Sequence, residues 1–225
     1  MYFSCNVSFS SLPVFLPTIL SQMGYSPITA QGLTAPPYFL SFLICIATTY
    51  LADRTQQRGL IIVVLSTVAG VGYILLATTL QVSIRYAGVF LAAGGVFPAI
   101  ANTLPWVLNN QGTDSKRGVA IALLNMVGQC GPLLGTRMFP STDGPRYVRG
   151  MGVCAGFMFF NVLLAVGLRG WFVRENRRLE RNERERREEG MGEGEGAVNK
   201  AGVLQAQRPM GASEMEENWG YRYVL

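Results

Sequence analysis

Long apolar runs without acidic residues constrain this chain more than any other feature. Between Met1 and Val173 the only acids are Asp53, Asp114 and Asp143, and each of them lies between apolar segments. A run of about 20 apolar residues is the length that an α-helix needs to cross the hydrocarbon core of a bilayer. Backbone polar groups must be satisfied within such a segment, so the runs predict transmembrane helices.

Six runs of this kind predict an all-α polytopic membrane protein, with residues 1–173 forming a six-helix transmembrane bundle. An even number of spans places both ends of the chain on the same side of the membrane. The arginines after Val173 predict that this side is cytoplasmic. The expected spans are Met1 to about Leu20, Leu33–Ala52, Leu60–Leu80, Tyr86–Leu108, Gly118 to about Met138, and Gly150–Val173.

Two further segments follow the predicted bundle. Residues 174–189 alternate arginine with glutamate, and Glu180 with Arg184 is one of the i,i+4 pairs that support a charged juxtamembrane helix. Residues 190–225 begin with a glycine–glutamate repeat and contain scattered polar residues. This composition predicts a disordered cytoplasmic tail.

Composition argues against several other classes of protein. The chain is 49% hydrophobic and 15% charged, which is too apolar for an ordinary soluble domain. Its basic residues flank apolar spans, which favours a signal for membrane orientation over a nucleic-acid surface. The four cysteines lie in separate apolar stretches and the chain has no histidine, so neither a metal site nor a cofactor is predicted. No span contains an acid and no nucleophile is paired with a base, so an enzyme is not predicted.

The turn between the second and third spans contains Asp53, Arg54 and Arg58. An acid at a helix end can cap the N-terminus of a neighbouring helix, and nearby arginines can pair with it or with helix-end carbonyls. Such a cluster would latch two helices together in one conformational state and release them in the next. The same arginines also fit a turn that only sets membrane orientation. The residues alone leave both interpretations open.

The fourth span contains a face with the features of a substrate-facing wall. Gly95, Pro98, Asn102 and Trp106 share that face at helical spacing. Pro98 and Pro105 are expected to break or bend the helix, as a gating helix requires. Asn102 could hydrogen-bond a carboxylate or amide of a substrate, and Trp106 could form a stacking wall. Packing between helices with a satisfied amide is the alternative.

Other intramembrane polar groups extend the list of candidates. Asn125 and Gln129 lie four residues apart in the fifth span and share a face. An unpaired amide is costly in hydrocarbon, so this face is expected to look into a bundle or a watery cavity. Asn6 in the first span and Tyr38 in the second are further candidates for substrate contact, and each fits core packing equally well.

Small residues predict where helices pack closely. Gly131 and Gly135 are four apart in the fifth span, and Gly152 and Gly156 form a GxxxG pattern in the sixth. Small residues at this spacing let the backbones of two membrane helices approach each other.

Several of these residues resemble a known family. The Asp53-Arg54 turn with Arg58, between the second and third helices of a six-helix unit, resembles the loop signature of the major facilitator superfamily. Leu51 replaces the glycine that is usual before this aspartate, and Arg58 stands where a basic pair is common. The second part of the chain resembles fungal allantoate-permease-type carriers, the anion:cation symporters. That resemblance is carried by Asn109-Asn110, Gly112, Lys116-Arg117, Asn125, Gly128, Gly131 and Pro145-Arg146-Tyr147.

The resemblance covers about Met1 to Arg178 and implies one half of a twelve-helix carrier, the carboxy-terminal half. It implies secondary active transport of a small organic anion or vitamin-like solute by alternating access, commonly with protons, at the plasma membrane. The six amino-terminal helices of such a carrier have no counterpart in this chain. The chain is therefore expected to be a truncated carrier or a half that needs a partner. A non-transporting membrane fragment is the alternative.

Overall fold

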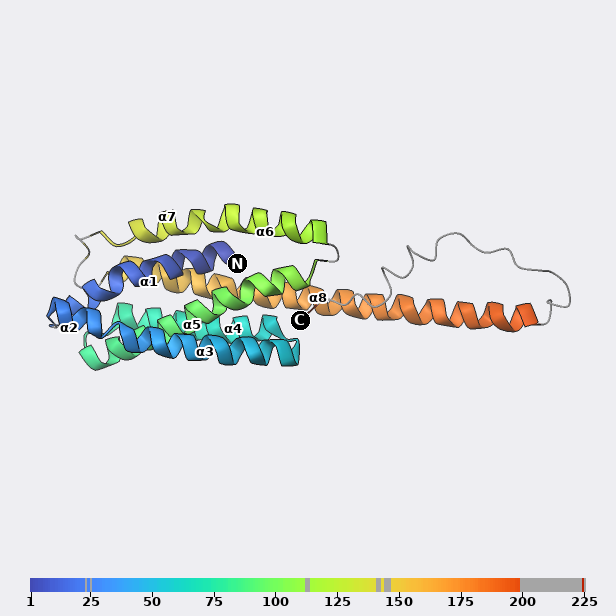
Figure 1. The fold of residues 1–225 in the computed structure, drawn as a ribbon, viewed down its shortest axis with the longest axis horizontal. Coiled ribbons are helices and arrows are strands. Elements are labelled where there is room, and N and C mark those ends of the chain that lie inside the picture. The colour runs from blue at the N-terminus through green and yellow to red at the C-terminus, as the bar shows by residue number, and fades with distance from the viewer. Residues whose placement is uncertain are drawn as a thin grey trace. The chain divides into compact units, whose positions relative to one another are not determined.

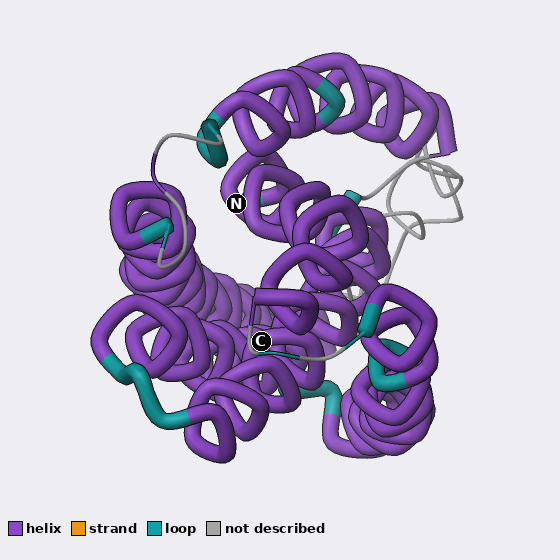
Figure 2. Tube along the Cα trace, turned by 90° about the vertical axis from the view of Figure 1, so that its left-hand side faces the viewer, coloured by secondary structure: helices purple, strands orange, loops and turns teal. Residues whose placement is uncertain are grey.

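The computed structural model describes residues 1–22, 24, 26–111, 114–140, 143, 147–198 and 224. Within these residues every regular element is a helix, and Figure 2 contains no strand among them. The predicted all-α class is therefore confirmed. The helices in Figure 1 are α1 (Tyr2–Gln22), α2 (Pro27–Gly32), α3 (Ala35–Thr55), α4 (Arg58–Thr78), α5 (Val82–Asn109), α6 (Asp114–Gly128), α7 (Cys130–Arg137) and α8 (Val148–Val198).

Five helical stretches of the described residues are long and apolar enough to cross a membrane. They are Pro27–Thr55, Arg58–Thr78, Val82–Asn109, Ser115–Arg137 and Val148–Arg186, and they correspond to the second to sixth predicted spans. The first predicted span is α1, which has 21 residues and is not among the five. It contains Asn6 and five serines.

The fifth predicted span is present, but it is not one regular helix. It consists of α6 and α7, which meet at Gln129. Pro132 has no N–H to donate to the carbonyl of Gly128, and its ring crowds that carbonyl, so the regular hydrogen-bond ladder stops there. Gln129 keeps nearly helical dihedral angles, φ −71° and ψ −8°, and its N–H donates to the carbonyl of Asn125 at 2.8 Å.

The fourth predicted span is α5, a continuous helix of 28 residues that contains both Pro98 and Pro105. Neither proline breaks the helix, so of the two predicted effects only bending stays a prediction. Each proline removes one backbone donor, so the carbonyls of Gly94 and Ala101 lose their helical partners. The ladder on either side is long enough to hold the helix together.

The chain divides into two compact units, Met1–Arg169 with Val224–Leu225, and Gly170–Tyr223. The first unit contains α1 to α7 and the apolar part of α8, and the second contains the charged part of α8. Helix α8 continues to Val198, into the segment for which the sequence predicts a disordered tail. Residues 199–223 of that segment lie outside the described residues, and the predicted domain boundaries stay predictions.

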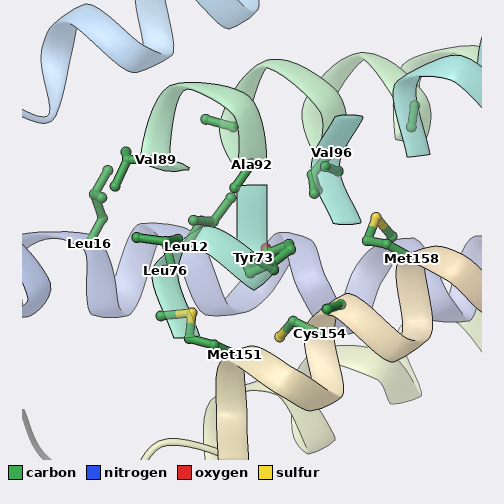
Figure 3. Close-up of a cluster of buried hydrophobic side chains, with 14 of the residues drawn as sticks. Leu12, Leu16, Tyr73, Leu76, Val89, Ala92, Val96, Met151, Cys154 and Met158 are labelled. Carbon is green, nitrogen blue, oxygen red and sulfur yellow. The ribbon is translucent and has the colours of Figure 1, made fainter. Parts of the chain in front are cut away.

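The core of the first unit lies where α1, α4, α5 and α8 meet (Figure 3). Leu12 and Leu16 of α1 are buried there beside Tyr73 of α4, Ala92 of α5 and Met158 of α8. This cluster ties together helices that are far apart in the sequence.

Glycines set how closely α4 and α5 approach each other. A Cβ added at Gly95 would lie 2.5 Å from the carbonyl oxygen of Leu65 and 2.6 Å from the backbone nitrogen of Ala69. A Cβ at Gly72 would lie 2.8 Å from the carbonyl oxygen of Gly88. These distances are far below ordinary contact, so the two backbones touch only because side chains are missing.

The two predicted small-residue pairs have different outcomes. Gly131 and Gly135 pack on α1, and a Cβ at Gly131 would lie 2.8 Å from the carbonyl oxygen of Phe3, so this prediction is confirmed. Gly152 and Gly156 have no described atom within 4 Å of an added Cβ, so the prediction of a packed GxxxG pair was wrong within the described residues. Helix α8 packs instead through the buried side chains of its other faces.

Candidate functional site

Three aromatic rings join the helices that are expected to face a substrate. Phe97 of α5 lies edge-on between Phe9 of α1 and Tyr38 of α3, with ring centroids 5.1 Å and 5.4 Å away and interplanar angles of 73° and 79°. Edge-to-face pairs of this kind are the preferred aromatic geometry. Tyr38 is therefore held where α1, α3 and α5 meet. Sequence reasoning missed Phe9 and Phe97, because aromatic residues occur throughout apolar spans and carry no signal of their own.

Asn102 lies fully buried on α5, where its side chain faces α3. Its Nδ2 donates to the carbonyl of Pro98 at 2.9 Å and, with a long contact of 3.4 Å, to Oγ1 of Thr48. Its Oδ1 has no hydrogen-bond partner among the described residues. Buried amide oxygens are normally satisfied. Asn102 thus offers an unused acceptor and a weakly engaged donor inside the bundle.

Asn6 lies against the junction of α6 and α7. It is 5% exposed, and its Nδ2 donates to the carbonyl of Tyr2 on its own helix at 2.9 Å. A Cβ added at Gly128 would lie 3.2 Å from that nitrogen, so the missing side chain of Gly128 makes room for the amide. Asn125 is half-buried and donates to the carbonyl of Ile121 at 3.0 Å, while Gln129 is exposed.

Trp106 lies near the end of α5 and is 2% exposed. Its indole N–H donates to the carbonyl oxygen of Val224 at 2.8 Å. The six predicted substrate-facing residues are therefore not gathered at one point. Tyr38 belongs to the aromatic trio and Asn102 lies between α5 and α3. Asn6 lies against the junction of α6 and α7, the region that contains Asn125 and Gln129. The indole N–H of Trp106 donates to a backbone carbonyl.

The charged turn between α3 and α4 brings Asp53 and Arg58 together as an ion pair. Gln56 adopts a left-handed conformation, with φ 55°, which ends α3 and folds the chain back so that Arg58 reaches Asp53. Arg54 donates to the hydroxyl of Tyr50 at 3.3 Å. The side chain of Arg58 is 6% exposed and that of Asp53 is 58% exposed.

Helix dipoles explain why this pair matters to the turn. Asp53 lies in the last turn of α3, where a carboxylate is unfavourable, and Arg58 lies in the first turn of α4, where a cation is unfavourable. In the ion pair, the carboxylate of Asp53 lies close to the N-terminus of α4 and the guanidinium of Arg58 lies close to the C-terminus of α3. Each charge then interacts favourably with the dipole of the neighbouring helix. The ion pair therefore stabilises the turn between the two helix ends, and the latch and the orientation signal both stay predictions.

Asn161 is a buried polar residue that sequence reasoning missed. It is 0% exposed on α8, and its Nδ2 donates to Oγ of Ser66 on α4 at 2.8 Å and contacts Sγ of Cys5 on α1 at 3.3 Å. The hydroxyl of Tyr73 donates to the carbonyl of Ser8 at 2.8 Å in the same region. A lone amide within an apolar run, the signal that drew attention to Asn125, was also present at Asn161.

The cysteines differ in accessibility. Cys5 and Cys154 are buried, Cys45 is half-buried, and Cys130 is exposed. Across the described ranges, no three His, Cys, Asp or Glu side chains come together as a group that could hold a metal ion.

The sequence profile of the Major Facilitator Superfamily matches residues 1–136, which is more than half of the chain. The chain belongs to the Major Facilitator Superfamily. This family and the apolar helices together make it an integral membrane protein. No solved structure matches the chain.

Curated relatives of this superfamily protein are named as transporters. It is 32% identical over 175 residues to "MFS-type transporter cnsO" of Penicillium expansum, covering 75% of this chain and 34% of that protein. It is 32% identical over 185 residues to "MFS transporter prlL" of Fungal sp. (strain NRRL 50135), covering 80% and 37%. It is 27% identical over 174 residues to the "High-affinity nicotinic acid transporter" of Saccharomyces cerevisiae, covering 77% and 33%. The chain thus spans about a third of the length of these relatives.

Proposed function

We propose that this chain forms the carboxy-terminal half of a secondary active carrier for a small organic anion or vitamin-like solute. The family match and the names of its relatives support transport. The relative named as a nicotinic acid transporter supports the class of solute. Within the superfamily we place the chain among the allantoate-permease-type symporters, with protons as the coupling ion, on the sequence motifs described above.

The observation that carries this proposal is the unsatisfied amide on α5. The Oδ1 of Asn102 has no partner among the described residues, and its Nδ2 donates to the carbonyl of Pro98 at 2.9 Å and, through a long 3.4 Å contact, to Thr48. The hydroxyl of Thr48 already donates to the carbonyl of Ile44 at 2.7 Å, so it does not depend on Asn102. The weakly held N–H of this amide suits a carboxylate oxygen of a solute. Its free oxygen suits a donor on the solute, such as an amide N–H or a hydroxyl, because an ionised carboxylate only accepts hydrogen bonds.

Alternating access needs a second wall and a gate. We propose that helices equivalent to the uncovered part of the relatives supply the second wall, with solute bound between the two halves near the midplane. Asp53 and Arg58 latch α3 to α4 in one state, and Arg54 supports the same turn. Pro98 and Pro105 are the positions where α5 flexes, because each lacks a backbone hydrogen bond. Both chain ends are assigned to the cytoplasm and the protein to the plasma membrane.

The test is uptake of radiolabelled nicotinate and of other small carboxylates by cells that express this chain joined to the remaining helices of a relative. Asn102→Ala is expected to weaken uptake at low solute concentration about tenfold or more, the value of one hydrogen bond to a charged group. Thr103→Val is the matched control, since Thr103 is also buried on α5 and its hydroxyl donates to the carbonyl of Ala99 on its own helix, at 2.7 Å. Unchanged affinity and rate in the Asn102 variant, with normal membrane insertion, would refute the assignment.

A non-transporting membrane fragment is the second candidate. Cells that express this chain alone separate the two functions. Accumulation of solute would establish transport by the chain itself, and its absence despite correct insertion would favour the fragment or a partner-dependent half.

A further inference from the structure

The side chains of Phe9, Tyr38 and Phe97 form an aromatic surface where α1, α3 and α5 meet. All three are half-buried, so part of each ring stays uncovered beside the core. Phe97 contacts both of the others edge-on, at centroid distances of 5.1 Å and 5.4 Å, which makes the surface continuous. In an edge-to-face contact a ring uses its edge or one face. Phe9 and Tyr38 therefore each keep a ring face that the contact with Phe97 does not use.

Two unused polar groups border this aromatic surface. The hydroxyl of Tyr38 has no hydrogen-bond partner among the described residues, although a tyrosine hydroxyl that is withdrawn from water usually has one. Asn102 is fully buried, and its Oδ1 has no partner in the described part of the chain. Asn102 follows Phe97 by five positions on α5, about 7.5 Å along the helix axis, and both side chains contact α3. Rings and unused polar groups therefore lie along one helix interface.

These groups together define the chemistry of a ligand. An aromatic ring can lie against the free faces and edges of the aromatic surface, and such contacts are worth more than the area that they bury. A saturated ring of the same size gains only the burial of its surface. The hydroxyl of Tyr38 can donate to an ionised carboxylate, which only accepts hydrogen bonds. The ligand class is therefore a carboxylate attached to a single aromatic ring.

We propose that Phe97 is a specificity-determining residue of the carrier, and that it selects solutes whose carboxylate is attached to an aromatic ring. Phe9 and Tyr38 flank the bound ring, and the hydroxyl of Tyr38 binds the carboxylate. This inference rests on the proposed function and deepens it, because it narrows the small organic anion to an aromatic acid. Ordinary packing of three rings would give no such preference, so a binding measurement separates the two interpretations.

The test compares benzoate with cyclohexanecarboxylate, which carry the same carboxylate on an aromatic and on a saturated ring of similar size. Both are ionised at neutral pH, and the saturated ring is at least as apolar, so partition into lipid cannot produce a preference for benzoate. Saturation-transfer NMR measures the dissociation constant of each acid for the full chain in lipid nanodiscs, and it detects the weak binding expected of one carrier wall. Benzoate is expected to bind about three- to tenfold more tightly, which is the value of one aromatic contact. Equal dissociation constants would overturn the proposal.

A pair of variants assigns the preference to Phe97. Phe97→Leu should abolish it and leave the binding of cyclohexanecarboxylate unchanged, which also shows that the variant is folded. Phe90→Leu is the matched control and should keep the preference. Phe90 is also half-buried on α5 and lies edge-on to a ring, that of Tyr86, with centroids 5.0 Å apart. A preference that survives Phe97→Leu, or that Phe90→Leu abolishes equally, would contradict the assignment.

Tyr38→Phe separates the ring of Tyr38 from its hydroxyl. This variant should weaken the binding of both acids about tenfold, the value of a hydrogen bond to a charged group, and leave their ratio unchanged. Unchanged dissociation constants would refute the role of the hydroxyl.

Uptake of the two acids by cells that express this chain joined to the remaining helices of a relative distinguishes the inference from the proposed function. Equal uptake of both acids would refute aromatic selection and support transport. Selective binding of benzoate without uptake of either acid would support the aromatic site and count against transport.

Discussion

Replacing Gly95 with alanine is expected to destabilise the membrane bundle, whereas the same change at Gly152 is not. A Cβ at Gly95 would lie 2.5 Å from the carbonyl oxygen of Leu65 and 2.7 Å from Cβ of Ala69. Backbone and a methyl group cannot rotate away, so α4 and α5 must separate. Gly152 has open space around an added Cβ among the described residues.

The size of the effect follows from these distances. Restoring ordinary contact at Gly95 requires a separation of about 0.8 Å, and such a gap forfeits roughly a third of the attraction between facing atoms. Over about forty atom pairs at about 0.15 kcal/mol each, the loss is about 2 kcal/mol. Alanine gains up to about 1 kcal/mol of helix propensity over glycine. That gain applies to both positions, so it cancels in the comparison of Gly95→Ala with Gly152→Ala.

The buried cysteines provide the assay. Cys5 and Cys154 are inaccessible in the folded bundle, so a thiol-reactive fluorophore reports their exposure on heating in detergent. Cys45 and Cys130 are first replaced by serine to remove background labelling. A difference of about 2 kcal/mol corresponds to a midpoint about 4 to 8 °C lower for Gly95→Ala than for Gly152→Ala.

Two outcomes would refute this reasoning. Equal midpoints for the two variants would mean that α4 and α5 are not in backbone contact at Gly95. A lower midpoint for Gly152→Ala would mean that α8 uses its GxxxG face after all. The double variant Gly72→Ala with Gly95→Ala should cost less than the sum of the two, because one separation of the helices relieves both contacts.

Two further predictions concern the charged turn and the surface of α7. Asp53→Asn should destabilise the chain more than Arg58→Gln, because it leaves a guanidinium that is 6% exposed without its partner, whereas a carboxylate that is 58% exposed remains hydrated. The midpoint assay described above checks the order, and equal effects would show that burial does not govern the pair. Cys130 lies beside the exposed Gln129, so a membrane-impermeant maleimide should label it if α7 borders water as a carrier wall must. Cys154 should remain unlabelled, and labelling of Cys130 only by a lipid-soluble reagent would place that face in lipid.

The candidate site was only partly predictable from the sequence. Asn102 and the Asp53–Arg58 turn were identified because polar groups are rare in apolar spans and each one stands out. Phe9 and Phe97 were not, since a ring in an apolar span gains meaning only from the rings it meets. The hydrogen-bond partner of each amide could not be predicted from the sequence either, because the side chains of Asn6, Asn125 and Asn102 all donate to carbonyls of their own helices.

The apolar runs alone were enough to predict that this protein is a set of apolar helices in a membrane. The reason is that a bilayer accepts few backbone structures, and a charge-free run of sufficient length has few alternatives. Which small residues form contacts between helices became known only from the packed fold. Gly131 and Gly152 stand in the same four-residue spacing, yet one meets the backbone of α1 and the other meets no described atom. Spacing specifies a face of a helix, whereas the rotation of that helix against its neighbours depends on all the side chains at once.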